Sequence, residues 1–200
     1  MKNLLKNIRK NYKKIILAGG AVLLIILMYL IFSGAWPVAL VNGHPITFSE
    51  FGRNYNIAYH FYQSELKINN KDTSVLDSKD GIAELNRAVL DSTIENEIIN
   101  EELNKILKPD DLNSIIDEKI SKVDLNSDNF QKGAELLYGL SLNDFKQFVL
   151  VPKAKEQIMQ GRLFSENRQL GDWLKEKKSQ SRVVIFIPGL AWDGGGVVKK

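Results

Sequence analysis

The sequence predicts a mainly α-helical domain with a small β-hairpin, carried behind one N-terminal transmembrane helix. Residues 15–32 form an uncharged apolar run of 18 residues, and a helix of that length at about 1.5 Å per residue covers most of a hydrocarbon core about 30 Å thick. Further along the chain, apolar side chains recur every three or four residues, which is the period of an amphipathic helix. Asn42-Gly43 between two short apolar runs is typical of a hairpin turn.

Charge predicts how this chain is oriented in a membrane. Six of the 27 basic residues lie in residues 1–14, and no acidic residue occurs before Glu50. By the positive-inside rule, residues 1–14 are a cytoplasmic tail, residues 15–32 a single pass through the cell membrane, and the bulk of the chain is extracytoplasmic. Trp36 then lies either at the membrane interface or packed on the domain.

A cleaved signal peptide is the alternative to a retained anchor. Ser33 and Ala35 supply small residues at the two positions that a signal peptidase reads, with cleavage after Ala35. The apolar run of 18 residues is longer than the usual 7–15 residues of a signal peptide core, which favours retention.

The exported part is expected to be one domain, residues 36–187, that begins with the hairpin at 38–47. Thr47 followed three residues later by Glu50 is a capping-box pattern, which predicts a helix start there. Aromatic residues at helical spacing extend this first helix to about Leu66.

Four further helical segments are expected from apolar periodicity, N-capping residues and prolines. Pro152 removes one backbone hydrogen bond, so the last of them should kink or divide near Leu150. The segments are a helix over 81–107, a short helix after Pro109 capped by Asp110 or Asp111, one or two turns over 130–138, and a helix begun by Ser141 whose second piece runs towards Lys178.

The C-terminal region combines one strand signal with a glycine-rich end. Residues 182–187 are rich in β-branched and aromatic side chains, which predicts a short strand able to join the hairpin. Residues 188–200 contain three successive glycines and are expected to be a flexible tail.

Composition excludes several chemistries. The chain has no cysteine and only two histidines, neither at a metal-binding interval, so we expect no metal site and no catalytic residue. The glycines at 194–196 lack the strand, helix, lysine and hydroxyl of a phosphate loop, so we expect no cofactor. Beyond residue 14 the chain carries 21 basic against 24 acidic residues, which argues against a nucleic-acid partner.

The strongest positive feature is apolar. Six aromatic residues on two predicted helices are candidates for a peptide-binding surface, in a groove between the first helix and the helix that begins at Ser141. Ordinary core packing is the alternative interpretation for each of them. The six are Phe48, Phe51, Tyr55, Tyr59, Phe145 and Phe148.

The order of these segments resembles a known family. VALVNGHPITFSEF from Val38, AVLDSTIENEIINEELNKIL from Ala88 and LLYGLSLNDFKQFVLVPKAKEQIMQGRL from Leu136 are together similar to the N-terminal chaperone domain of the SurA and PpiD type, found with parvulin prolyl isomerases in bacterial cell envelopes. The resemblance implies a mostly helical fold that clasps unfolded polypeptide, without nucleotide, in a bacterial protein. Only residues 165–200 remain after it, too few for a parvulin domain.

These observations lead to three functional hypotheses. The first is a membrane-anchored, non-catalytic chaperone domain that binds unfolded or exported polypeptides. The second is a truncated or split peptidyl-prolyl isomerase whose catalytic domain is on a protein partner. The third is a structural subunit of a membrane or envelope complex.

Overall fold

A computed structural model describes residue 16, residue 20, residues 33–125 and residues 127–200. The helices are α2 (Phe48–Ile68), α3 (Lys79–Ile106), α4 (Pro109–Ser121), α5 (Asp128–Tyr138), α6 (Leu142–Phe145), α7 (Val151–Ser165) and α8 (Leu170–Gln180), with a 3-10 turn η1 (Ser74–Asp77) and a π-helical segment η2 (Lys146–Leu150). The strands are β1 (Pro37–Val41), β2 (His44–Thr47), β3 (Val183–Ile185), β4 (Leu190–Trp192) and β5 (Val197–Lys199).

The predicted fold class is confirmed for the described part of the chain, which is mainly helical with a small sheet. Within it, no helix is long and apolar enough to cross a membrane. The cytoplasmic tail and the transmembrane helix predicted at residues 1–14 and 15–32 lie outside the described residues, apart from Ile16 and Gly20. Those two assignments therefore stay predictions.

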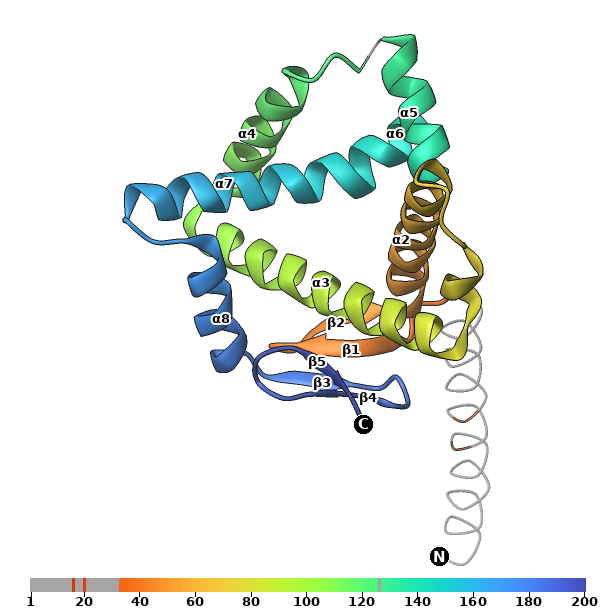
Figure 1. Ribbon diagram of the computed structural model, residues 1–200. Helices are drawn as coiled ribbons and strands as arrows, with labels where there is room; N and C mark the ends of the chain where they lie inside the picture. The colour runs from red at the N-terminus through yellow and green to blue at the C-terminus, as the bar shows by residue number, and fades with distance from the viewer. Residues whose placement is uncertain (1–15, 17–19, 21–32, 126) are drawn as a thin grey trace, which may run out of the picture.

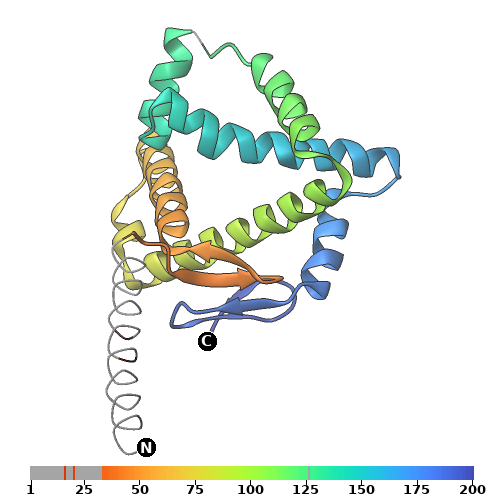
Figure 2. The ribbon, with the colours of Figure 1, turned by 180° about the vertical axis from the view of Figure 1, so that it is seen from behind.

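Three long helical segments set the shape of the domain. α2, α3 and the continuous run from α6 through η2 to α7 lie along the sides of a triangle, as Figures 1 and 2 show from opposite directions. α4 and α5 form a second layer beyond α7, and the sheet lies along the far side of α3. The core runs along α3, where Leu90, Ile94 and Leu103 are fully buried.

The helix starts at Thr47 and Ser141 are confirmed. Thr47 Oγ1 accepts a hydrogen bond from Glu50 N at 3.2 Å, and Ser141 Oγ accepts one from Asp144 N at 3.2 Å. Each satisfies a backbone N–H that has no partner within the helix.

The predicted cap of the helix after Lys108 is wrong. α4 begins at Pro109 itself, with Lys108 as the N-cap residue and no side-chain cap. Proline suits the first helical position because that position needs no N–H and the ring fixes a helical φ. Asp110 and Asp111 instead occupy the first turn, where their charge interacts favourably with the helix dipole.

The sequence predicts a kink or division near Leu150, but the helix is not divided there; a π-helical segment precedes Pro152. η2 precedes α7, and the backbone stays helical through Leu150 (φ −73°, ψ −38°). Pro152 lies in the first turn of α7, where a missing backbone N–H costs least. The second piece ends at Ser165, so the predicted run towards Lys178 is wrong. Asn167 has φ +55°, a left-handed conformation that asparagine tolerates, and it lies in the break before α8.

The predicted C-terminal strand joins the hairpin. β1 pairs antiparallel with β2 and, on its other side, with β3, so the strand order is β2-β1-β3. Asn42 and Gly43 have φ of 52° and 94° at the hairpin turn, as expected. Asn42 also exchanges hydrogen bonds of 2.9 Å with the backbone of Arg182, which fixes the position of β3.

The expected flexible tail at 188–200 is instead a second β-hairpin, β4–β5. Leu190 and Val197 are 5% and 2% exposed, and Val197 hydrogen-bonds to Asp91 and Arg87 of α3. The glycines form the turn, where Asp193 Oδ1 accepts from Gly195 N and Gly196 N, both at 2.8 Å. Asp193 fixes a conformation that glycine content alone would leave free.

Candidate functional site

An open groove of about 940 Å³ lies between α2, α3 and the η2–α7 segment. It corresponds to the position predicted from the sequence, between the first long helix and the segment that begins at Ser141. Five aromatic side chains line it: Phe61, Tyr62, Tyr138, Phe145 and Phe148.

Three of the aromatic rings that line this groove contact one another. Tyr138 is 5.2 Å from Phe61 and 5.0 Å from Phe145 between ring centroids, and Phe145 is 5.6 Å from Phe130. Burial raises the pKa of Tyr138, which keeps its phenol neutral. Tyr62 also lines the groove and is 44% exposed, so part of the aromatic lining is in contact with solvent. Rings packed in this way present a stable apolar surface.

Two polar side chains of the groove lining, Asn54 and Thr93, form hydrogen bonds within the protein. Thr93 is 3% exposed, accepts a hydrogen bond from Asn54 Nδ2 at 3.1 Å and donates one to Val89 O at 2.8 Å. The bond from Asn54 joins α2 to α3, and the bond to Val89 lies within α3.

Arg53 supplies a positive group without a compensating carboxylate. Its Cζ lies 4.0 Å from the centroid of the Phe148 ring, a cation–π contact. Its Nε is buried without a hydrogen-bond partner among the described residues, and no described carboxylate forms an ion pair with it. The guanidinium is therefore suited to bind acceptor oxygens of a ligand.

Two lysines also line the groove: Lys153, which pairs with Glu156 at 2.7 Å, and Lys155. Lys155 Nζ donates to Asn100 Oδ1 at 2.6 Å. Burial lowers the pKa of Lys155, and the nearby Glu97 partly opposes this effect.

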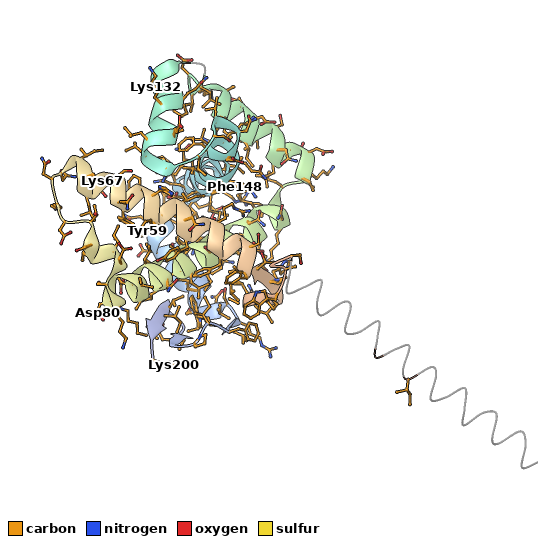
Figure 3. All side chains as sticks on the ribbon, turned by 90° about the vertical axis from the view of Figure 1, so that its right-hand side faces the viewer. Tyr59, Lys67, Asp80, Lys132, Phe148 and Lys200 are labelled. Carbon is orange, nitrogen blue, oxygen red and sulfur yellow. The ribbon has the colours of Figure 1, made fainter. Side chains whose placement is uncertain are left out.

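The six sequence-predicted aromatic residues do not lie together. Phe145 and Phe148 line the groove, and Figure 3 shows Phe148 where α2 meets the η2–α7 segment, with Tyr59 on α2 itself. Phe51 is 7% exposed in the core. Tyr55 packs against that core, and the Tyr59 hydroxyl donates to Asp77 Oδ1 of η1 at 2.8 Å. Phe48 packs instead on Trp36, with ring centroids 5.6 Å apart.

Among the groove residues that the sequence did not indicate as site residues are Arg53, Phe61, Tyr62 and Tyr138. Phe61 and Arg53 lie off the regular aromatic stripe of α2, and Tyr138 ends a short helix. A signal was available at Tyr138, because Gly139 (φ +66°) follows it as the C-cap and marks the residue where α5 meets α2.

Glu97, beside the groove, supports a pH-dependent prediction. Burial raises its pKa above the ordinary 4.5, while His44, 3.6 Å away, opposes the rise. Because the ionised form is disfavoured in the folded protein, Glu97→Gln should raise the free energy of unfolding at pH 7. The gain should shrink as pH falls through the folded pKa and vanish below pH 4.5, where both states are protonated.

Chemical denaturation at several pH values measures this difference. Glu118→Gln is the control, because the ion pair with Lys122 lowers the pKa of Glu118. That substitution should act in the opposite direction at pH 7. A Glu97→Gln variant that is less stable than the wild type at pH 7 would show that the attraction to His44 outweighs burial.

Comparison with known proteins identifies the family. The sequence model for the SurA-like N-terminal domain matches residues 5–134, nearly two thirds of the chain. The match includes α2, α3 and α4, and it ends within α5, before the η2–α7 wall of the groove. No curated protein and no solved structure matches the chain significantly. The helical fold, the hairpin at 37–47 and the long α3 agree with the match, and the chain belongs to the family of SurA-like N-terminal domains.

Proposed function

We propose that this protein is a membrane-anchored, extracytoplasmic chaperone that binds unfolded or exported polypeptides without catalysis. Membership of the SurA-like family indicates a chaperone-type function in general. The observation that carries the finer proposal is the open groove of about 940 Å³ with its aromatic lining. Its volume suits a few side chains of an extended peptide.

The groove offers two kinds of contact to a polypeptide. Phe61, Tyr62 and Phe148 supply apolar surface for client side chains. Arg53 supplies N–H donors for backbone carbonyl or carboxylate oxygens, which every unfolded segment carries. Neither contact depends on one client sequence. Affinity should be modest, so that clients dissociate without nucleotide hydrolysis.

The anchor predicted at residues 15–32 would hold this groove beside polypeptides emerging from the membrane. Tethering raises the effective concentration of groove and client, so weak binding is sufficient. Support for the anchor is the uncharged run of 18 residues and the six basic residues before it.

The test is client binding by the full chain in nanodiscs. Tyr62→Ser and Phe148→Ser each remove an aromatic contact worth about 1–2 kcal/mol, so each should raise the Kd for an unfolded, fluorescently labelled polypeptide about 5–30-fold. Suppression of aggregation of the same client should fall in parallel. Tyr62 is 44% exposed, so its replacement should leave the domain folded.

Phe164→Ser is the matched control, because Phe164 is 81% exposed on α7 and does not line the groove. Its Kd should stay within about twofold of the wild type. Equal Kd values for all three variants would contradict binding in the groove. A proline-peptide isomerisation rate above background would contradict the non-catalytic assignment, and one stably co-purifying partner without client binding would favour a structural subunit.

A further inference from the structure

Three exposed aromatic side chains lie outside the groove at the end of the three-stranded sheet. Trp36 is 47% exposed, Phe48 is 49% exposed and Phe186 is 49% exposed. Trp36 directly precedes β1, Phe48 directly follows β2 and Phe186 directly follows β3. Large aromatic residues at this level of exposure leave apolar surface in contact with solvent.

The strand register places these three residues at the same end of the sheet. Pro37 is paired with Thr47, and Ala39 is paired with Ile185. The start of β1 therefore lies between the end of β2 and the end of β3. Backbone hydrogen bonds continue this arrangement past the strands, from Phe48 N to Trp36 O at 2.9 Å and from Phe186 N to Val38 O at 2.8 Å.

The outer face of the sheet extends the same apolar surface. Leu40 of β1 is paired with Val184 of β3 and with Pro45 of β2. Val184 is 41% exposed and Pro45 is also exposed. The buried residues Ala39, Val41 and Ile46 point the other way, into the core.

The chain reaches this end of the sheet directly from the predicted membrane span. The apolar run ends at Phe32, and the four residues to Trp36 can extend about 14 Å at most. Ser49 N donates to Gly34 O at 3.0 Å, and a Cβ on Gly34 (φ +64°) would lie 3.2 Å from Ser49 Cβ. Residues 34–36 are thus packed against the start of α2, which holds the aromatic residues close to the end of the span.

We propose that Trp36, Phe48 and Phe186 insert into the membrane–water interface and fix the orientation of the domain on the lipid surface. Aromatic side chains, and an indole with its N–H in particular, are favoured at the headgroup level. The predicted span at 15–32 and the aromatic residues at the end of the sheet would then both contact the same membrane. The domain is therefore held at two places and not by the chain connection at residues 33–36 alone. The proposal rests on the anchor in the proposed function, but it does not depend on client binding in the groove.

The experiment is quenching of tryptophan fluorescence by brominated phospholipids in vesicles that contain the full chain. The chain has three tryptophans, of which Trp173 is 3% exposed and Trp192 has its indole nitrogen buried. Lipids brominated near the headgroup end of the acyl chain should quench the wild type. Trp36→Phe should abolish this quenching, because Trp36 is its source.

Phe48→Ser combined with Phe186→Ser should reduce the quenching by about half or more, whereas Phe164→Ser should leave it unchanged. Three results would overturn the proposal: no quenching of the wild type, equal quenching of Trp36→Phe, or a chain that does not float with the vesicles. A change in Trp36 emission on addition of unfolded client, with no effect of lipid, would also overturn it and identify this surface as a client site. Wild-type chain that is quenched by these lipids but does not bind the unfolded client would contradict only the groove.

Discussion

Ending the chain after Ile187 should lower the free energy of unfolding by about 4 kcal/mol, the largest effect that we expect. The truncation removes Leu190 and Val197, which are 5% and 2% exposed, and burial of each such side chain contributes about 1.5–3 kcal/mol. It also removes the hydrogen bonds between Val197 and two α3 residues, Asp91 and Arg87. Among the described residues, Asp91 would then keep its ion pair with Lys178.

Denaturation of the full chain in detergent, followed by far-ultraviolet circular dichroism, measures this loss. A chain that ends at Lys199 is the control, because it loses only the bond from Lys200 N to Gly189 O, worth about 1 kcal/mol. If truncation after Ile187 cost no more than the control, residues 188–200 would behave as the flexible tail expected from their glycines.

Lys178→Met should lower the free energy of unfolding by about 2–3 kcal/mol. Lys178 is 7% exposed and lies 3.2 Å from Asp91 Oδ1 and 2.5 Å from Glu95 Oε1, measured from its Nζ. Methionine keeps the apolar stem but leaves two acidic residues, one helical turn apart, without their cation. The expected loss is below that of a fully buried pair because Asp91 and Glu95 are 22% and 34% exposed.

The pH dependence of this substitution has a definite sign. Burial alone would lower the pKa of Lys178, but the hydrogen bond to Glu95 and the charges of Glu95 and Asp91 outweigh it, so the pKa is raised above 10.5. The contribution is therefore complete below pH 10.5 and is lost as pH rises through the folded pKa. The difference between wild type and Lys178→Met should shrink in that alkaline range.

Lys177→Met is the matched control on the neighbouring residue. Lys177 pairs with Glu102 at 3.1 Å, but both side chains are partly exposed, at 29% and 23%. A pair of this kind contributes about 0–1 kcal/mol. If both substitutions lowered the free energy of unfolding by the same amount, burial of Lys178 would not strengthen its ion pairs.

The helices were largely predictable because their signals are local. Thr47 and Ser141 cap α2 and the α6 segment, and Pro109 and Pro152 lie at helix starts. Each effect acts over one helical turn, so neighbouring residues suffice to recognise it. The end of α7 was predicted wrongly because a local signal is missing there. The apolar spacing of residues 151–178 continues through Asn167 and does not indicate the break before α8.

The candidate site was predictable in position but only partly in composition. The sequence predicts that the regular stripe of Phe51, Tyr55 and Tyr59 on α2 is a candidate binding surface. In the structure this stripe packs against the core and η1. A regular apolar stripe is what a neighbouring helix can cover most completely. The groove is lined instead by residues such as Phe61, which lies on another face of α2. That face borders the groove because of the angle at which the η2–α7 segment packs near α2.

The helical class, the helix starts at Thr47 and Ser141, the 38–47 hairpin, the third strand and the resemblance to the family could all be predicted from the sequence, because they depend on local backbone preferences and on the order of motifs. Tertiary structure decided which aromatic faces are buried, how Arg53 meets Phe148 and how β4–β5 folds onto α3. These contacts join residues far apart in the chain, such as Asp91 and Val197, and packing between segments selects among faces that periodicity leaves equivalent.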